Sequence, residues 1–201
     1  MLSFLNLKKI NMIEVRRSLD QNLSELFGYL KRATADTRSP FRQPVLTTVD
    51  DNGTPHSRML VLREINAPQH LIFFTDARTP KVAQLRQNRM ASLLFWDPRK
   101  RVQLSMQVAV HMVEDDARLA SYRDRVRGRA QQSYTTVLPP GTQVQKPEDA
   151  ETWTDFESDN HFMVLECRPV SLTVLQLSGE RHLRFVAEKK GDVWDASWVV
   201  P

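Results

Sequence analysis

The chain has 201 residues, of which 41% are hydrophobic, 8% are aromatic and 26% are charged. This length fits a single domain, residues 1–201, that can bury its own core. The 28 basic residues modestly exceed the 24 acidic ones, which favours anionic ligands, but the dispersed charge and few aromatics argue against a nucleic-acid-binding protein. Cys167 is the only cysteine, so an intrachain disulfide and a cysteine metal site are excluded. With no evident signal peptide or membrane-spanning run, we expect a cytoplasmic protein.

Residues 1–40 predict an N-terminal helix followed by a loop. Apolar residues recur there at helical spacing, at Val15, Leu19, Leu23, Leu26, Phe27 and Leu30. Two strands follow, at residues 45–49 and 54–64, and the turn sequence Asp50-Asp-Asn-Gly53 joins them. Aspartate, asparagine and glycine suit the backbone of tight hairpin turns, so these two strands should form a β-hairpin.

Most of the remaining chain predicts strands. We expect them at residues 70–75, 91–96, 102–113, 162–167, 171–177, 183–188 and 193–199, with short helices at 81–88 and 115–125. Residues 127–160 are polar and contain Pro139-Pro140-Gly141, so they predict a long loop with a brief helical piece. Loops of this length are usually functional or disordered. Many hairpin-linked strands with few helices predict a mainly β fold, an antiparallel barrel with helical attachments.

The sharpest sign of function is the sequence Thr79-Pro80-Lys81 at the start of the helix at 81–88. Threonine suits the N-cap position and proline suits the first helical position. The free N–H groups and the positive end of the helix dipole then form a site for a phosphate. Lys81 opposes that dipole, and a bound anion would remove the conflict. The pattern therefore predicts a protein that binds a phosphate-bearing cofactor.

Arg58 and Arg63 flank the apolar run 59–62 of the second predicted strand. Because alternate residues of a regular strand point to opposite faces, both arginines can reach one ligand only if the strand bends or bulges, or if the ligand wraps its end. Three charged hydrogen bonds to a phosphate supply about 5–9 kcal/mol before the cost of immobilising the ligand. Micromolar binding needs about 8 kcal/mol net, so other groups must also hold the ligand. Apolar Leu60 and Phe74 and the amide of Gln103 are the candidates.

These segments resemble the flavin mononucleotide (FMN) segments of the pyridoxamine 5′-phosphate oxidase family. The resemblance lies in Arg58-Met-Leu-Val-Leu-Arg63, Phe74-Thr75, Thr79-Pro-Lys81 and Gln103, and it continues in the tail Arg181-His-Leu-Arg184-Phe185. The form of the middle segment is most similar to the less characterised branch of FMN-binding split-barrel proteins. The resemblance implies an antiparallel split β-barrel and a homodimer with FMN between the protomers.

The resemblance also implies a role for each matching residue. Arg58, Thr79 and Lys81 would hold the FMN phosphate. Leu60 and Arg63 would lie along the flavin or its ribityl chain, and Phe74 and Thr75 would supply further contacts. Gln103 and Arg184 would reach the flavin of the partner subunit, while His182 would face the substrate.

Two departures from the family's oxidase bear on activity. Glu180 stands where the oxidase has an arginine before its substrate histidine, and Leu175 stands where it has a tryptophan beside the flavin. A carboxylate repels a phosphorylated substrate, so the sequence supports FMN binding more strongly than oxidation of a vitamin B6 phosphate. The first hypothesis is an FMN-dependent oxidoreductase with a small-molecule substrate. The alternatives are a non-catalytic protein binding FMN or a related cofactor, and, more distantly, nucleic-acid binding by the basic segment 123–129.

Overall fold

The computed structural model describes residues 11–177 and 181–201 of the chain. Within these ranges nine strands form one antiparallel sheet, which confirms the expected mainly β fold with helical attachments. The sheet order is β2-β1-β5-β6-β7-β4-β3, and β8 pairs with both β7 and β9. The strands are β1 Val45–Val49, β2 Pro55–Met59, β3 Leu62–Asn66, β4 His70–Asp76, β5 Met90–Asp97, β6 Val102–Met112, β7 Phe162–Gln176, β8 Leu183–Lys190 and β9 Val193–Val199.

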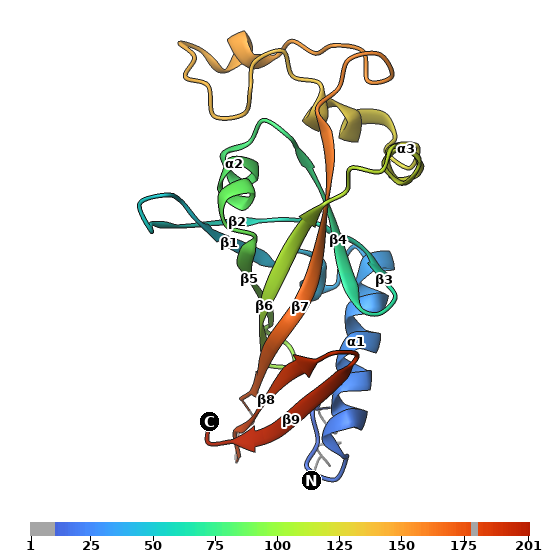
Figure 1. The fold of residues 1–201 in the computed structure, drawn as a ribbon, viewed down its shortest axis with the longest axis vertical. Helices are drawn as coiled ribbons and strands as arrows, with labels where there is room; N and C mark the ends of the chain where they lie inside the picture. The colour runs from blue at the N-terminus through green and yellow to red at the C-terminus, as the bar shows by residue number, and fades with distance from the viewer. Residues whose placement is uncertain (1–10, 178–180) are drawn as a thin grey trace, which may run out of the picture.

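Strand β7 is the place where the sheet divides. One edge of β7 pairs with β6, while the other edge pairs first with β4, over residues 162–167, and then with β8, over residues 171–176. Figure 1 shows β6 and β7 running through the molecule along its long axis, with the β8–β9 hairpin at one end. Residues 127–160, which we call the long segment, lie before β7 at the opposite end of the molecule (Figure 1).

The helices are α1 Leu19–Ala35, α2 Pro80–Gln87 and α3 Asp116–Arg123, with 3₁₀ turns η1 Pro40–Arg42, η2 Gly128–Tyr134 and η3 Pro147–Ala150. Helix α1 begins at Leu19, four residues after Val15, because Ser18 and Gln21 form a reciprocal capping box there. Its apolar face packs Leu26 and Leu30 into the core, and both side chains are fully buried. Val15 lies outside the helix and is exposed, so the predicted start was too early.

The main core lies between α1 and one face of the sheet. Alternate residues of β5 and β6 point into it, including Leu93, Phe95, Leu104 and Met106, which are all fully buried. A second cluster holds the long segment to the end of β4 and β7. It contains Ile72, Val113, Tyr122, Val126, Tyr134, Phe156, Phe162 and Val164. The segment 127–160 contains two short helical turns, η2 and η3, where the sequence predicted one brief helical piece.

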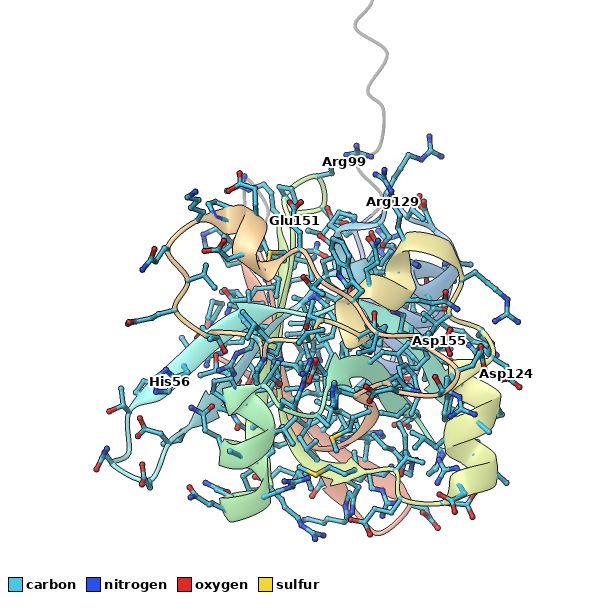
Figure 2. All side chains as sticks on the ribbon, turned by 90° about the horizontal axis from the view of Figure 1, so that it is seen from above. His56, Arg99, Asp124, Arg129, Glu151 and Asp155 are labelled. Carbon is cyan, nitrogen blue, oxygen red and sulfur yellow. The ribbon has the colours of Figure 1, made fainter. Side chains whose placement is uncertain are left out.

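The predicted hairpin of β1 and β2 is confirmed, and its turn is held by one carboxylate. Asp50 Oδ1 accepts the backbone N–H groups of Asn52 (3.0 Å) and Thr54 (2.8 Å), while Gly53 takes a φ of 81°. His56 Nε2 lies 2.9 Å from the second Asp50 oxygen, and these hydrogen bonds lower the pKa of Asp50. Figure 2 shows His56 on this hairpin, which extends away from the rest of the molecule.

Two predicted strand boundaries were wrong. The strand expected over residues 54–64 is two strands, since β2 ends at Met59 and β3 begins at Leu62. Conversely, the strands expected at 162–167 and 171–177 are one continuous strand, β7. Pro169 is tolerated because the register with β6 shifts beside it, so that Pro169 faces Val108 while Ser171 faces Gln107. Proline is accommodated within sheets at such bulges.

Candidate functional site

A cavity of about 430 Å³ lies where the β2–β3 junction, the end of β4, α2 and the long segment meet. Six of the predicted cofactor-binding residues line it: Leu60, Arg63, Phe74, Thr75, Thr79 and Lys81. The cavity also contains residues that were not among the predicted cofactor-binding residues, namely Gln43, Met59, Val61, Asp76, Ser133, Tyr134 and Pro140. The structure thus brings residues of the segments 58–63 and 74–81 together at one place, although Arg58 itself is not among the lining residues.

Lys81 occupies the first turn of α2 and points back toward the end of β4. Its Nζ donates hydrogen bonds to Thr75 Oγ1 at 2.9 Å and to Thr79 Oγ1 at 3.0 Å. Thr79 stands at the predicted N-cap position, but its hydroxyl donates to the Asp76 carbonyl instead of capping the helix. The start of α2 therefore has no side-chain cap, and the positive end of its dipole lies beside an ammonium group. Pro80 has no N–H, and the Val82 N–H donates to the Thr79 carbonyl at 2.9 Å.

A second cation lies near Lys81. Arg58 reaches from β2 toward β1 and α2, where it donates to Thr48 Oγ1 (2.5 Å) and to Gln84 Oε1 (3.4 Å). Burial, together with the positive charge of Arg58, lowers the pKa of Lys81 to about 8, and the Asp76 carboxylate only partly opposes this. Two neighbouring positive groups that are partly removed from water favour a bound anion between or beside them.

The β2–β3 junction explains how Arg63 reaches the same cavity. In the pairing of β3 with β4, Leu62 faces Phe73 and Glu64 faces Ile72, so the register shifts at Arg63. This bulge and the break after Met59 supply the bend that the sequence argument required.

The guanidinium of Arg63 lies over the ring of Phe74, 5.4 Å from its centroid. Its Nε is buried and makes no hydrogen bond with any described residue. Tyr134 lies close to Arg63. Burial raises the pKa of the Tyr134 hydroxyl, and the neighbouring Arg63 guanidinium only partly offsets this rise. A buried donor without a partner is costly, so the site has an unused cationic hydrogen-bond donor beside an aromatic wall.

The long segment is fastened beside the cavity by Arg78. Its guanidinium pairs with Asp76 Oδ2 at 2.8 Å and donates to the carbonyls of Thr136 (2.8 Å) and Val137 (3.2 Å). This clamp positions Tyr134, two residues before Thr136. Sequence reasoning missed Tyr134 because its place at the site depends on these contacts between distant segments; the only available signal was the length of the segment.

The remaining predicted residues lie elsewhere in the chain. Gln103 faces Leu175 across the β6–β7 pair, and Leu175 faces Arg184 across the β7–β8 pair. His182 and Arg184 line a separate hollow of about 340 Å³ together with Arg181, Leu183, Trp198 and other residues, none of which lines the first cavity. Arg184 Nε is buried without a hydrogen bond to any described residue. Glu180 falls outside the described residues.

Gln103 and Arg184 lie on the face of the sheet that points away from the main core, because their neighbours Leu104 and Phe185 are buried in that core. This outer sheet face, as we call it, contains the exposed side chains of Met59, Leu94 and Trp96, which are 62%, 39% and 42% exposed. Cross-strand pairing places Met59 beside Val45 and Val45 beside Leu94, so the apolar residues are contiguous. Contiguous exposed apolar residues on a sheet mark an interaction surface.

Other candidate centres are weak. Cys167 is fully buried, and this burial raises the pKa of its thiol far above the usual range, so the thiol is a poor nucleophile. Among the described residues no cluster of histidine, cysteine, aspartate or glutamate could hold a metal ion. No described helix combines the length and the apolar character that crossing a membrane requires.

Comparisons with known proteins point to one family. The sequence model of the family described as pyridoxamine 5′-phosphate oxidase matches residues 32–157. A pyridoxine/pyridoxamine 5′-phosphate oxidase of Agrobacterium fabrum is 30% identical over 100 residues, which are 50% of this chain and 48% of that protein. The corresponding protein of Yersinia enterocolitica is 37% identical over 81 residues, 40% of this chain and 37% of that protein. The chain thus spans about half or less of the length of these relatives.

Solved structures show the same fold. A pyridoxamine 5′-phosphate oxidase-related, FMN-binding protein of Nostoc punctiforme aligns with a TM-score of 0.73 at 24% identity, covering 88% of this chain and 96% of that one. PhzG of Burkholderia lata, solved with tetrahydrophenazine-1-carboxylic acid, aligns with a TM-score of 0.72 at 18% identity, covering 89% and 92%. These likenesses confirm the split β-barrel. Because the family match covers more than half of the chain, the protein belongs to the pyridoxamine 5′-phosphate oxidase family.

Proposed function

We propose that this protein binds FMN and uses it as an oxidoreductase. The observation that carries the proposal is the pair of cations, Arg58 and Lys81, beside the hydroxyls of Thr75 and Thr79 at the uncapped start of α2. Phosphate groups bind at such helix ends, and charged hydrogen bonds to them contribute about 1.5–3 kcal/mol each. The solved FMN-binding relative from Nostoc punctiforme supports the choice of this cofactor.

The residues of the cavity fit the remainder of FMN. Leu60 and Phe74 offer apolar surface next to the phosphate site, and Arg63 offers a buried Nε without a partner among the described residues. A heterocycle with acceptor atoms at its edge would satisfy that donor, and a positive group there favours a reduced, anionic ring. In this proposal Arg58, Thr79 and Lys81 hold the phosphate, while Leu60, Arg63, Phe74 and Thr75 contact the flavin or its ribityl chain.

We further propose that two copies of the chain complete the site. Gln103, His182 and Arg184 lie away from the cavity of their own chain, but Gln103 and Arg184 share the outer sheet face with exposed Leu94 and Trp96. A homodimer formed through this face would cover the apolar side chains. Gln103 and Arg184 of one protomer would then reach the flavin of the other, and His182 would face the substrate.

The chemistry divides between cofactor and chain. When bound, FMN supplies hydride transfer to and from a small substrate. The chain neutralises the phosphate through Lys81 and Arg58, orients the ring against Phe74, and shields it from water with the segment that Arg78 fastens. In the proposed dimer, His182 of one protomer contacts the substrate beside the flavin of the other protomer.

The substrate to test first is pyridoxamine or pyridoxine 5′-phosphate, since the curated relatives are named as oxidases of these compounds. The protein, loaded with FMN, is mixed with pyridoxamine 5′-phosphate in air, and formation of the aldehyde product and of hydrogen peroxide is followed. Turnover supports the proposal. Retention of FMN without turnover of any B6 phosphate favours the second candidate, a non-catalytic FMN-binding protein. The observation behind this candidate is Glu180 in the sequence, because a carboxylate repels a phosphorylated substrate.

The nucleic-acid alternative gains little from the structure. Within the basic segment 123–129, Arg125 pairs with Glu64 at 2.5 Å, and Arg127 donates to the carbonyl of Val126. Paired arginines offer a weaker surface to a phosphate backbone than free ones. Oligonucleotide binding that falls steeply with salt would nevertheless support this alternative.

A further inference from the structure

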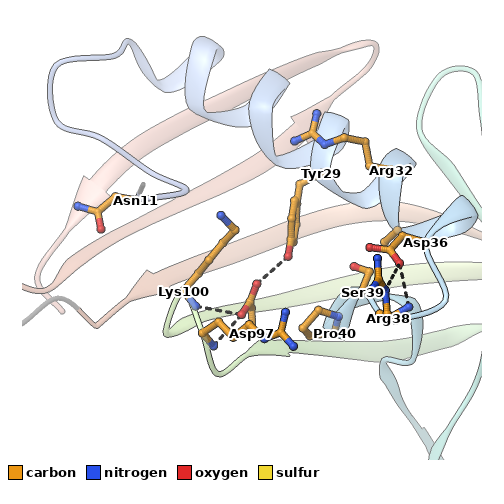
Figure 3. A pocket seen from close by; sticks show the side chains of 11 residues that line it. Asn11, Tyr29, Arg32, Asp36, Arg38, Ser39, Pro40, Asp97 and Lys100 are labelled. Carbon is orange, nitrogen blue, oxygen red and sulfur yellow. Dashed lines mark hydrogen bonds and ion pairs between the residues drawn. The ribbon is translucent and has the colours of Figure 1, made fainter. Parts of the chain in front are cut away.

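A second cavity, of about 690 Å³, opens between α1, η1 and the turn that joins β5 to β6 (Figure 3). It shares no lining residue with the proposed flavin site. Along β5 the side chains alternate, so Trp96 is exposed on the outer sheet face while Asp97 is buried on the α1 side. A dimer formed through the outer sheet face would therefore leave this cavity open.

Positive side chains outnumber carboxylates at the cavity wall. Arg32, Arg38, Arg99 and Lys100 line it, against Asp36 and Asp97. Arg32 also pairs with Glu25, which does not line the cavity, at 2.9 Å. Arg38 is 90% exposed and only 3.8 Å from Asp36, a loose pair in water. Among the described residues no ion pair within 4.0 Å involves Arg99 or Lys100.

The buried carboxylate is already satisfied by the protein itself. Asp97 is 1% exposed and accepts the Tyr29 hydroxyl at 2.6 Å. It also accepts the backbone N–H groups of Arg99 and Lys100, at 2.8 and 2.9 Å, which shapes the turn. Figure 3 shows these contacts. Asp97 therefore fixes the backbone of Arg99 and Lys100. Because its oxygens already accept these hydrogen bonds, it is less able to neutralise the side chains of the two residues.

Tyr29 further orders the cations. Lys100 Nζ lies 5.5 Å and Arg32 Cζ lies 5.8 Å from the centroid of its ring. Burial and the neighbouring Asp97 raise the pKa of the Tyr29 hydroxyl to about 12, so it stays a neutral donor to that carboxylate. The Ser39 hydroxyl also lines the cavity and makes no hydrogen bond of normal geometry with the described residues. Lys100 and Arg32 are thus held beside the Tyr29 ring, while Arg38 and Arg99 are exposed. Cations grouped in this way beside a hydroxyl are suited to an anion.

We propose that this cavity is a second anion site, which takes a small phosphate ester or polyphosphate. Arginine forks match phosphate oxygens in geometry as well as charge. Residues 1–10 precede the lining residue Asn11, and their sequence contains Lys8 and Lys9 but no carboxylate. They carry no negative side chain that could complement the four cations.

The test uses the full chain, saturated with FMN, and inorganic pyrophosphate as the probe, with binding measured by calorimetry at low salt. Arg38 and Arg99 are exposed, so the double variant Arg38→Ala/Arg99→Ala should fold. The control, Arg129→Ala/Lys146→Ala, removes the same charge from exposed positions of the long segment, outside the cavity. A Lys81→Ala variant reports on the flavin phosphate site.

We expect the wild-type protein to bind pyrophosphate with a Kd of about 1 mM or tighter. The Arg38→Ala/Arg99→Ala protein should bind about tenfold or more weakly, while the control protein and Lys81→Ala bind as the wild type does. Absence of binding overturns the proposal. So does an equal loss in the control protein, which would show unspecific attraction to positive charge, and so does a loss confined to Lys81→Ala. Failure of the protein to retain FMN bears on the proposed function and leaves this test intact.

Discussion

The pKa of Lys81 predicts that FMN binding weakens as the solution becomes alkaline. In the free protein, burial and Arg58 lower this pKa from 10.5 to about 8. A bound phosphate would raise it again, because an opposite charge stabilises the ammonium form. Binding above pH 8 must therefore take up a proton, and the affinity must fall as pH rises.

The expected size follows from the fraction of charged lysine. At pH 9, one unit above a pKa of about 8, only about one-tenth of the free protein carries charged Lys81, so the affinity would fall about tenfold, or roughly 1.4 kcal/mol. Lys81 is partly exposed, and solvent screening reduces the effect, so we expect a loss of about three- to tenfold between pH 7 and pH 9.

Fluorescence titration of FMN at both pH values measures this loss. Lys81→Met is the matched control, because it keeps the length of the side chain, removes the titrating group and leaves the titration of FMN itself unchanged. The variant should bind more weakly than the wild type at pH 7, by more than tenfold, and its affinity should change little between the two pH values. An equal pH dependence in wild type and Lys81→Met would refute the placement of the phosphate beside Lys81.

Four further predictions concern other parts of the account. Arg58→Ala should weaken FMN binding more than tenfold, on the order of 1.5–3 kcal/mol, with an unchanged circular dichroism spectrum; wild-type affinity in fluorescence titration would contradict its role. Phe73→Ala, at a fully buried position, should lower the free energy of unfolding in urea by about 3–5 kcal/mol, and a loss below about 1 kcal/mol would be inconsistent with this core. Leu94→Lys should turn the proposed dimer into a monomer in sedimentation experiments. Arg78→Ala should speed proteolysis within residues 127–160, and no change would argue against the clamp.

Local sequence signals predicted the elements whose causes are local. The strand β1 and the start of α2 were found because alternation and the Thr79-Pro80 pair act over a few residues. The break between β2 and β3 was missed, since residues 59–62 read as one apolar run and only the pairing of β3 with β4 reveals the bulge at Arg63. The continuity of β7 through Pro169 was missed for the same reason, because the shifted register belongs to β6 as much as to β7.

The candidate site shows the same division. Lys81, Thr75 and Thr79 lie within seven consecutive residues, so their proximity could be inferred from the chain alone. Tyr134 reaches the cavity through contacts between segments far apart in the chain, namely the hydrogen bond of Arg78 to Thr136 and the packing of Tyr134 on Phe162. The relation of Gln103 to Arg184 depends on two successive strand pairings, which no local pattern specifies.

The measurement that tests the central claim most directly is a titration of the purified protein with FMN, followed by fluorescence and by the absorbance that remains after desalting. We expect quenching that saturates at about one FMN per chain and a protein that stays yellow. A protein that neither quenches FMN nor retains it would contradict the assignment of Arg58, Lys81 and the start of α2 as a flavin phosphate site.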